Sequence, residues 1–363
     1  MGRQLDRIGV KGYKSIRELD LDLSALNILI GANGAGKTNF ISLFKLLNEI
    51  VRENLQTFVR VAGGADTFLY FGAKTTSEIL IKLDFGVNSY ECTLVPTAND
   101  SLIFADEKSW FHRGRYIDHH PIPLGSGHKE TKLHEIARTD RVTRYVLEAL
   151  QSWKVYHFHD TSDTAKIKKT GDISDNKILQ SDASNLAAFL YLLQERYHEY
   201  YQKIVATIRL AAPFFDNFVL QPDRLNSNKI QLEWREKGSD TYFNANSLSD
   251  GTLRFICLTT LLLQPNLPST ILIDEPELGL HPYAITLLAA MLRGAAEKTQ
   301  VIVSTQSVPL VNQFDPEDII IVDREGEQST FRRPTLADME SWLEEYGLGD
   351  LWEKNLIGGR PQR

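Results

Sequence analysis

A glycine-rich segment, Gly31 to Thr38 with the sequence GANGAGKT, constrains this chain more than any other feature. It matches the pattern G-x-x-x-x-G-K-[ST] and follows an apolar run over residues 26–30 that predicts a buried strand. After it, apolar residues recur at helical spacing from Phe40 to Leu47. Glycines let backbone N–H groups approach phosphate oxygens, and a helix starting there points its positive end at the same anion. The segment therefore predicts a phosphate-binding loop (P-loop) between a strand and a helix.

Two side chains of this loop carry the expected chemistry. Lys37 is expected to reach the β- and γ-phosphates of ATP and to assist catalysis, and Thr38 is expected to ligate Mg²⁺. ATP and Mg²⁺ are therefore the expected ligands. The other positions expected to bind nucleotide here are Asn33, Gly34, Ala35, Gly36 and Asn39.

An acidic pair follows a second apolar strand pattern, at residues 270–273. Asp274 at the strand tip is expected to hold Mg²⁺ or its water, and Glu275 to polarise the attacking water as general base. A strand that merely ends in an acidic turn is the ordinary alternative. The presence of a P-loop in the same chain favours the catalytic interpretation.

A third motif, Leu248-Ser249-Asp250-Gly251, stands at the start of a helix predicted over residues 250–263. Ser249 or Asp250 would serve as an ordinary helix N-cap. Alternatively, Ser249 and the N–H of Gly251 contact a γ-phosphate at the helix start.

The remaining periodicity predicts an α/β fold. Alternating segments predict an antiparallel meander early in the chain, and the last third alternates helix and strand, as in a parallel sheet. Strands are expected at residues 6–10, 19–23, 78–85, 89–95, 152–158, 229–234, 300–304 and 318–322. Helices are expected at residues 183–211 and 282–297, residues 161–182 are expected to form a mobile loop, and residues 97–150 receive no assignment.

The order P-loop, Leu-Ser-x-Gly, Asp-Glu-Pro resembles that of an ABC-type ATPase head. The opening GYKSI at residues 12–16, followed by NILIGANGAGKTN at residues 27–39, is similar to the RecF/SMC/OLD branch of these ATPases. The segment PELGLHP at residues 276–282 resembles the D-loop region of that branch. The resemblance covers about residues 1–95 and 245–325.

This resemblance implies further site residues. Lys14 and Ser15 occupy the opening motif and would contact the nucleotide. Gln306 stands where the family carries a switch residue, often histidine; it can hydrogen-bond a γ-phosphate but cannot take a proton at neutral pH. The Q-loop would lie within residues 156–161, where His159 is preferred slightly over His157, and an ordinary surface loop is the alternative.

The implied architecture is an ABC-type P-loop NTPase head with an antiparallel β subdomain and a helical insertion. Residues 1–96 would form ATPase lobe I with the P-loop, and residues 97–245 an insertion. Residues 246–325 would form lobe II with the signature and Walker B motifs, and residues 326–363 a C-terminal helix and tail.

The implied function is an ATP-hydrolysing subunit that dimerises head to tail, with each nucleotide between Lys37 of one copy and Ser249 of the other. It would act as a clamp or sensor for a separately encoded effector, such as a nuclease or toxin, in anti-phage defence or DNA transactions. Only about 40 residues follow Asp323, which is too few for the nuclease domain of the OLD branch. One alternative is an ATP-bound scaffold that holds such a partner inactive. Another is a RecF-like repair ATPase that binds duplex DNA directly.

Composition limits the remaining classes. The net charge of −7 argues against nucleic-acid binding through overall charge, although residues 108–115, 166–169 and 359–363 are locally basic. No apolar run is long enough to span a bilayer, so no membrane partner is expected. The two cysteines, Cys92 and Cys257, form no disulfide framework or zinc motif, and the cytoplasm is the expected compartment.

Overall fold

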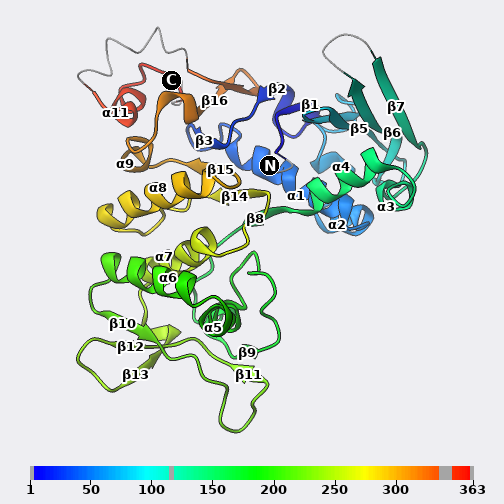
Figure 1. The fold of residues 1–363 in the computed structure, drawn as a ribbon. Helices are drawn as coiled ribbons and strands as arrows, with labels where there is room; N and C mark the ends of the chain where they lie inside the picture. The colour runs from blue at the N-terminus through cyan, green and yellow to red at the C-terminus, as the bar shows by residue number, and fades with distance from the viewer. Residues whose placement is uncertain (1–3, 114–117, 335–345, 360–363) are drawn as a thin grey trace.

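The computed structural model describes residues 4–113, 118–334 and 346–359 (Figure 1). A six-stranded central sheet has the order β17-β16-β3-β15-β14-β8, and every neighbouring pair except β16 and β17 is parallel. Its strands are β17 (Gln328–Arg332), β16 (Ile319–Glu325), β3 (Leu26–Ile30), β15 (Gln300–Thr305), β14 (Thr270–Asp274) and β8 (Trp153–Tyr156). The carboxyl ends of the parallel strands therefore meet at one edge, where sheets of this kind bind ligands.

Helices and a second sheet bury the two faces of the central sheet in different cores. Successive side chains of a strand point to opposite faces, so Ile271 and Ile273 of β14 lie in one core and Leu272 lies in the other. The first core also contains α7 (Asp250–Leu263) and α8 (Pro282–Ala296), and the second contains α1 (Lys37–Val51). Near-continuous apolar strands are the sequence pattern that such two-sided burial requires.

The second sheet is antiparallel throughout, in the order β2-β1-β4-β5-β6-β7. Its strands are β1 (Arg7–Tyr13), β2 (Ile16–Asp22), β4 (Ile79–Phe85), β5 (Asn88–Pro96), β6 (Leu102–Arg113) and β7 (Asp118–Gly125). The associated helices are α2 (Leu55–Val61), η1 (Ala65–Thr67), α3 (Leu133–Ile136) and α4 (Arg141–Gln151). The expected boundary at residue 97 falls inside this sheet, because β6 and β7 continue it.

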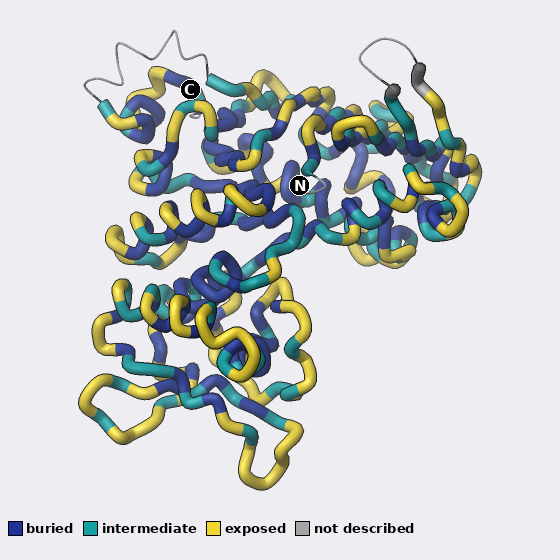
Figure 2. Tube along the Cα trace, viewed as in Figure 1, coloured by how far each residue is buried: buried dark blue, intermediate teal, exposed yellow. Residues whose placement is uncertain are grey.

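A helical part lies on the side of α7 and α8 that faces away from the central sheet (Figure 1). It contains α5 (Leu186–Arg196) and α6 (His198–Ala211), and its far end carries small strands whose loops are largely exposed (Figure 2). These elements are η2 (Lys166–Lys168), β9 (Gly171–Asp172), β10 (Phe215–Phe218), β11 (Lys229–Ile230), β12 (Glu233–Glu236), β13 (Tyr242–Asn244) and η3 (Ala245–Ser247).

Three local expectations differ from the structure. The helix expected over residues 183–211 is two helices separated at Tyr197, whose φ of −133° and ψ of 52° leave the helical region. The strand expected at residues 229–234 divides between β11 and β12. The expected mobile loop at residues 161–182 contains η2 and β9, and its Ile167 is buried in the core. In the first two cases the structure interrupts an element that local periodicity makes continuous, and in the third, burial of an apolar side chain orders a polar segment.

The C-terminal region adds α9 (Val308–Val311), η4 (Pro316–Asp318) and α11 (Leu348–Glu353). The expected C-terminal helix and tail fall partly on residues 335–345 and 360–363, which lie outside the described residues. Within the described ranges, every helix is too short or too polar to cross a bilayer.

Candidate functional site

The P-loop connects β3 to α1 at the carboxyl edge of the central sheet. Gly34 and Gly36 have φ values of +80° and +124°, which side-chain-bearing residues rarely adopt. A Cβ on Gly36 would also overlap the hydroxyl of Ser329, and a Cβ on Gly31 would overlap the carbonyl of Val322. Backbone conformation and the neighbouring strands β16 and β17 therefore both require glycine in this loop.

Lys37 opens α1 and is only 5% exposed. Its Nζ donates hydrogen bonds to the carbonyl oxygens of Gly31 at 2.5 Å and Ala32 at 3.1 Å. Burial lowers the pKa of its ammonium, and the charges of Glu275, Asp274 and Glu277 oppose that shift. The ammonium is thus held at the P-loop within the field of the acidic motif.

The opening motif packs beside the P-loop. Lys14 has a φ of +47° in the tight turn between β1 and β2, and its Nζ donates to Ser42 Oγ at 3.1 Å. Ser15 Oγ accepts hydrogen bonds from Asn39 Nδ2 and Ser329 Oγ, each at 2.7 Å. Lys14, Ser15 and Asn39 are therefore gathered around the first turns of α1, and Ser329 is an additional neighbour.

The acidic pair lies at the tip of β14. Asp274 is in register with Ser304 of β15, whose hydroxyl donates to the Asp274 carboxylate. Glu275 N donates to Ser304 O at 2.8 Å, and Glu275 has a φ of +44°. Such a backbone costs about 1–3 kcal/mol in a non-glycine residue and is typical of functional sites.

Two segments meet here: the acidic segment, residues 274–281, and the switch segment, residues 305–307. The side-chain amide of Gln306 donates to the carboxylate of Glu275. Gln306 is thus a direct neighbour of Glu275, the candidate general base.

Glu277 joins the same two segments and was not predicted as a site residue. It is 9% exposed, and its Oε1 accepts from Thr305 Oγ1 and from Gln306 N at 3.3 Å. Its Oε2 is buried with no hydrogen-bond partner in the described structure, and burial raises the pKa of the carboxyl. A third acidic residue, directly after the Asp-Glu-Pro motif, was the available sequence signal.

Ser249 is an exposed N-cap of α7, and its Oγ accepts from Thr252 N at 3.2 Å. The structure therefore contains the ordinary capping arrangement. A Cβ on Gly251 would overlap the carbonyl of Gly279, so the first turn of α7 packs directly on the acidic segment. Among the described residues, no hydrogen bond links Ser249 to the P-loop of the same chain.

The Q-loop candidates follow β8. His157 is half-buried, and burial together with the charges of Lys45 and His159 lowers its pKa to about 4. His159 is exposed, and its carbonyl accepts from Arg254 at 3.0 Å. His157, which the sequence ranked second, therefore lies deeper in the charged surroundings of the site, with Lys45 and Asp274 near it.

The donors present suit a magnesium ion. Thr38, exposed in the first turn of α1, offers a hydroxyl and Asp274 a carboxylate, and Mg²⁺ prefers such oxygen ligands together with water and phosphate. Ser304 holds the Asp274 carboxylate from the neighbouring strand.

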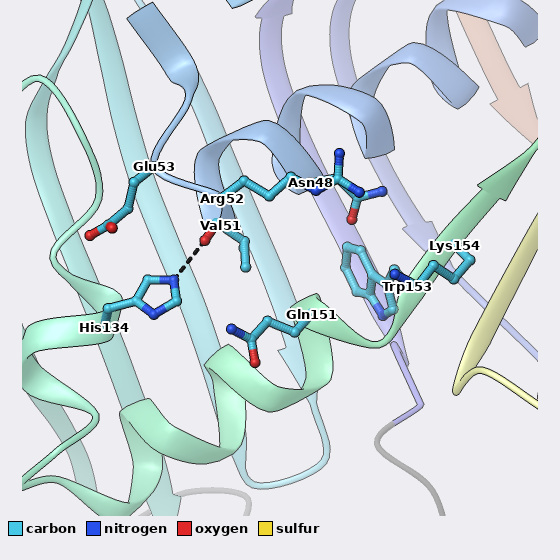
Figure 3. Close-up of a pocket in the computed structure, with 8 residues that line it drawn as sticks. All are labelled: Asn48, Val51, Arg52, Glu53, His134, Gln151, Trp153 and Lys154. Carbon is cyan, nitrogen blue, oxygen red and sulfur yellow. Dashed lines mark hydrogen bonds between the residues drawn. The ribbon is translucent and has the colours of Figure 1, made fainter. Parts of the chain in front are cut away.

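A separate cavity of about 360 Å³ lies at the far end of α1 (Figure 3). There His134 Nε2 contacts the carbonyl of Val51 at 2.7 Å. The lining residues are Asn48, Val51, Arg52, Glu53, His134, Gln151, Trp153 and Lys154. None of the motif residues lines this cavity, so it is distinct from the P-loop site.

Comparison with known proteins agrees with this architecture. An Smc head in a crystal structure with the C-winged helix domain of ScpA aligns at a TM-score of 0.58, with 13% identity over 93% of this chain and 99% of that one. The Pyrococcus furiosus Smc head bound to the C-terminal domain of ScpA aligns at 0.53, with 15% identity over 94% and 98%. These similarities show an ABC-type P-loop fold.

One sequence relative and one family model complete the comparison. The OLD nuclease of Thermus scotoductus is 24% identical over 349 residues, which is 88% of this chain and 62% of that protein. A family model described as "AAA domain, putative AbiEii toxin, Type IV TA system" matches residues 26–312, well over half of the 363 residues. The chain belongs to this AAA-domain family, within the RecF/SMC/OLD-like branch of ATPases.

Proposed function

We propose that this chain hydrolyses ATP, dimerises head to tail around two nucleotides, and acts as a nucleotide-controlled clamp on a separately encoded effector. The observation that carries the proposal is the convergence of Lys37, Asp274 and Glu275 at one sheet edge. Ser249 stays exposed at the start of α7. It is therefore free for the contact that the proposed dimer requires, in which a γ-phosphate on Lys37 meets Ser249 of a second copy.

The proposed chemistry assigns each side chain one task. Lys37 binds the β- and γ-phosphates, and Thr38 and Asp274 hold Mg²⁺, which neutralises charge on the phosphate oxygens. Glu275 orients the attacking water and accepts its proton. Gln306 fixes the Glu275 carboxylate through its amide hydrogen bond.

The effector is proposed to be a nuclease or toxin that serves anti-phage defence or DNA transactions. Support comes from the relative named as an OLD nuclease, of which this chain spans 62%. The family description, which includes a toxin of a type IV TA system, points the same way.

A second candidate is an ATP-bound scaffold that turns over slowly and holds its partner inactive. The glutamine at position 306 favours it, because a side-chain amide cannot take a proton at neutral pH. Direct binding to duplex DNA has less support: Lys108 is paired with Asp106 at 2.6 Å, and Lys168 is only 5% exposed.

Light scattering of a Glu275→Gln variant with and without Mg-ATP tests the clamp. A shift from monomer to dimer on ATP is expected, and adding Ser249→Arg or Lys37→Ala to the same variant should abolish it. A mass that ATP leaves unchanged contradicts the clamp, and a constitutive assembly would favour the scaffold.

A further inference from the structure

We propose that Arg254 is the positioning residue through which the start of α7 sets the conformation of the acidic segment, and with it the Glu275 carboxylate. This inference rests on the proposed function, because it concerns how the same ATP site is controlled. Arg254 lies five positions after Ser249, on the helix that a second copy's nucleotide would contact.

The Arg254 guanidinium binds three backbone carbonyls in two loops. Its Nε donates to Phe158 O at 3.0 Å, and one terminal nitrogen donates to His159 O at 3.0 Å. The other terminal nitrogen donates to Leu278 O, in the acidic segment, at 2.8 Å. Because the guanidinium is planar with donors in fixed directions, these contacts fix α7 relative to both loops at once.

Core packing holds only one of the three contact points, since the Phe158 side chain is buried in the core. The Leu278 side chain is 46% exposed and His159 is exposed, so core packing does not fix their positions. The overlap that a Cβ on Gly251 would make with Gly279 O places the first turn of α7 against the same segment. A displacement of the α7 start is therefore transmitted to Leu278 and Gly279.

The acidic segment passes that displacement to the catalytic candidate. Glu277 adjoins Leu278, and its Oε1 accepts from Thr305 Oγ1 and Gln306 N. Gln306 in turn donates to the Glu275 carboxylate. A continuous series of contacts thus runs from Arg254 through the two segments to Glu275, and a buried carboxylate lies at its centre.

The experiment compares Arg254→Met and Arg254→Lys with Arg293→Met. Arg293, on α8, is a matched control because its side chain is 48% exposed and its Asp315 partner lies at 3.6 Å, outside the site. In Arg254→Met we expect kcat to fall about 100-fold, the scale of a misplaced catalytic group. Lysine should recover part of that loss, and Arg293→Met should behave as wild type.

Three further readouts separate positioning from a purely structural role. ATP affinity, measured in the Glu275→Gln background, should change less than about threefold, and the melting temperature should fall by no more than about 4 °C, because the lost hydrogen bonds are local. Hydrogen exchange at the amides of residues 275 and 277–281, which requires no turnover, should accelerate about tenfold in Arg254→Met.

Each opposing result has a distinct meaning. Wild-type exchange at the amides of residues 275 and 277–281 in Arg254→Met overturns the inference, whatever the hydrolysis assay shows. A wild-type kcat in that variant does so as well, and leaves the proposed ATPase intact. A joint loss of ATP affinity and thermal stability also overturns it, since Arg254 would then only brace the fold. Absence of hydrolysis in the wild type would instead contradict the proposed function.

Discussion

The side-chain amide of Gln306 donates a hydrogen bond to the carboxylate of Glu275, its neighbour across the tips of β14 and β15. The backbone fixes the same residue, because Glu275 N donates to Ser304 O at 2.8 Å. Glu275 also has a left-handed φ of +44°. Glu275 is therefore fixed through both its side chain and its backbone in an uncommon conformation. Such pre-organisation is what an electrostatic catalyst requires.

Removing the Gln306 amide tests its role in holding Glu275. In Gln306→Ala we expect kcat to fall about 10- to 100-fold while KM changes little. The Glu275 carboxylate would no longer be held in its orientation, whereas the phosphate-binding loop would be unchanged. Steady-state ATPase assays over a range of ATP concentrations measure both constants. A histidine at this position can donate from its ring nitrogen, so Gln306→His should retain more activity. Equal kcat in wild type and Gln306→Ala would show that the contact is incidental.

Two substitutions of Glu277 should have opposite effects on the free energy of unfolding. Glu277→Ala removes the acceptor of Thr305 Oγ1 and Gln306 N, and unsatisfied buried donors should cost about 2 kcal/mol of unfolding free energy. Glu277→Gln keeps an oxygen acceptor and removes the buried charge. It should therefore be at least as stable as the wild type at neutral pH. Urea unfolding of the three proteins makes the comparison.

The pH dependence supplies the control for Glu277. Burial raises the pKa of the folded carboxyl above its unfolded value, so its stabilising contribution is present below the unfolded pKa and is lost as pH rises through the folded one. The stability of wild type relative to Glu277→Gln should thus decline with rising pH. A difference that is constant with pH would mean that this carboxyl does not titrate abnormally.

Local signals were enough for the strands and helices that carry the motifs. The helix predicted at residues 250–263 is α7, and the strand predicted at residues 26–30 is β3. Both predictions succeed because the spacing of apolar residues reflects which face of an element is buried. The P-loop glycines were likewise predictable, since their backbone conformations exclude other residues. The α/β class follows from these local features and the ABC-type head from the resemblance of the ordered motifs, and the structure and the comparisons confirm both.

Features that depend on distant neighbours were not predictable. Strand β6 was missed because Glu107, a charged residue at a fully buried position, interrupts the alternation that marks a strand. Its carboxylate accepts from Tyr90 OH at 2.8 Å and contacts His128 Nε2 at 2.8 Å, partners that only the folded sheet supplies. The Gln306–Glu275 contact joins residues 31 apart and has no local signature.

Gly251 and Gly294 form a matched pair of glycine substitutions. In Gly251→Ala the new Cβ would overlap Gly279 O, so the backbone must shift at a cost of about 2 kcal/mol, and ATPase activity should fall with it. Gly294, inside α8, has open space around its Cβ position, so alanine there should stabilise by about 0.5–1 kcal/mol. Urea unfolding and ATPase assays test both. A neutral Gly251→Ala would show that α7 and the acidic segment separate readily.

The half-buried imidazole of His157 should make the folded protein less stable as the pH falls. Its folded pKa is lowered to about 4, mainly by burial, from an unfolded value near 6.5. Between these values the unfolded chain binds the proton more tightly, so acidification favours unfolding, and this contribution is complete only above about pH 6.5. His157→Gln removes the titrating group. The wild type should therefore lose more stability than the variant between pH 7 and pH 4.5, by about 1 kcal/mol because solvent screens a half-buried imidazole.

Thermal melting of both proteins across that pH range measures the difference, and groups that titrate equally in the two proteins cancel. His159→Gln is the matched control, because His159 is exposed and lies two positions along the same segment. Its loss of stability on acidification should stay close to that of the wild type, because burial is the main cause of the lowered His157 pKa and the charge of His159 is a smaller one. Parallel curves for wild type and His157→Gln would show that His157 is solvated in solution, and a placement beside Lys45 and Asp274 would then be contradicted.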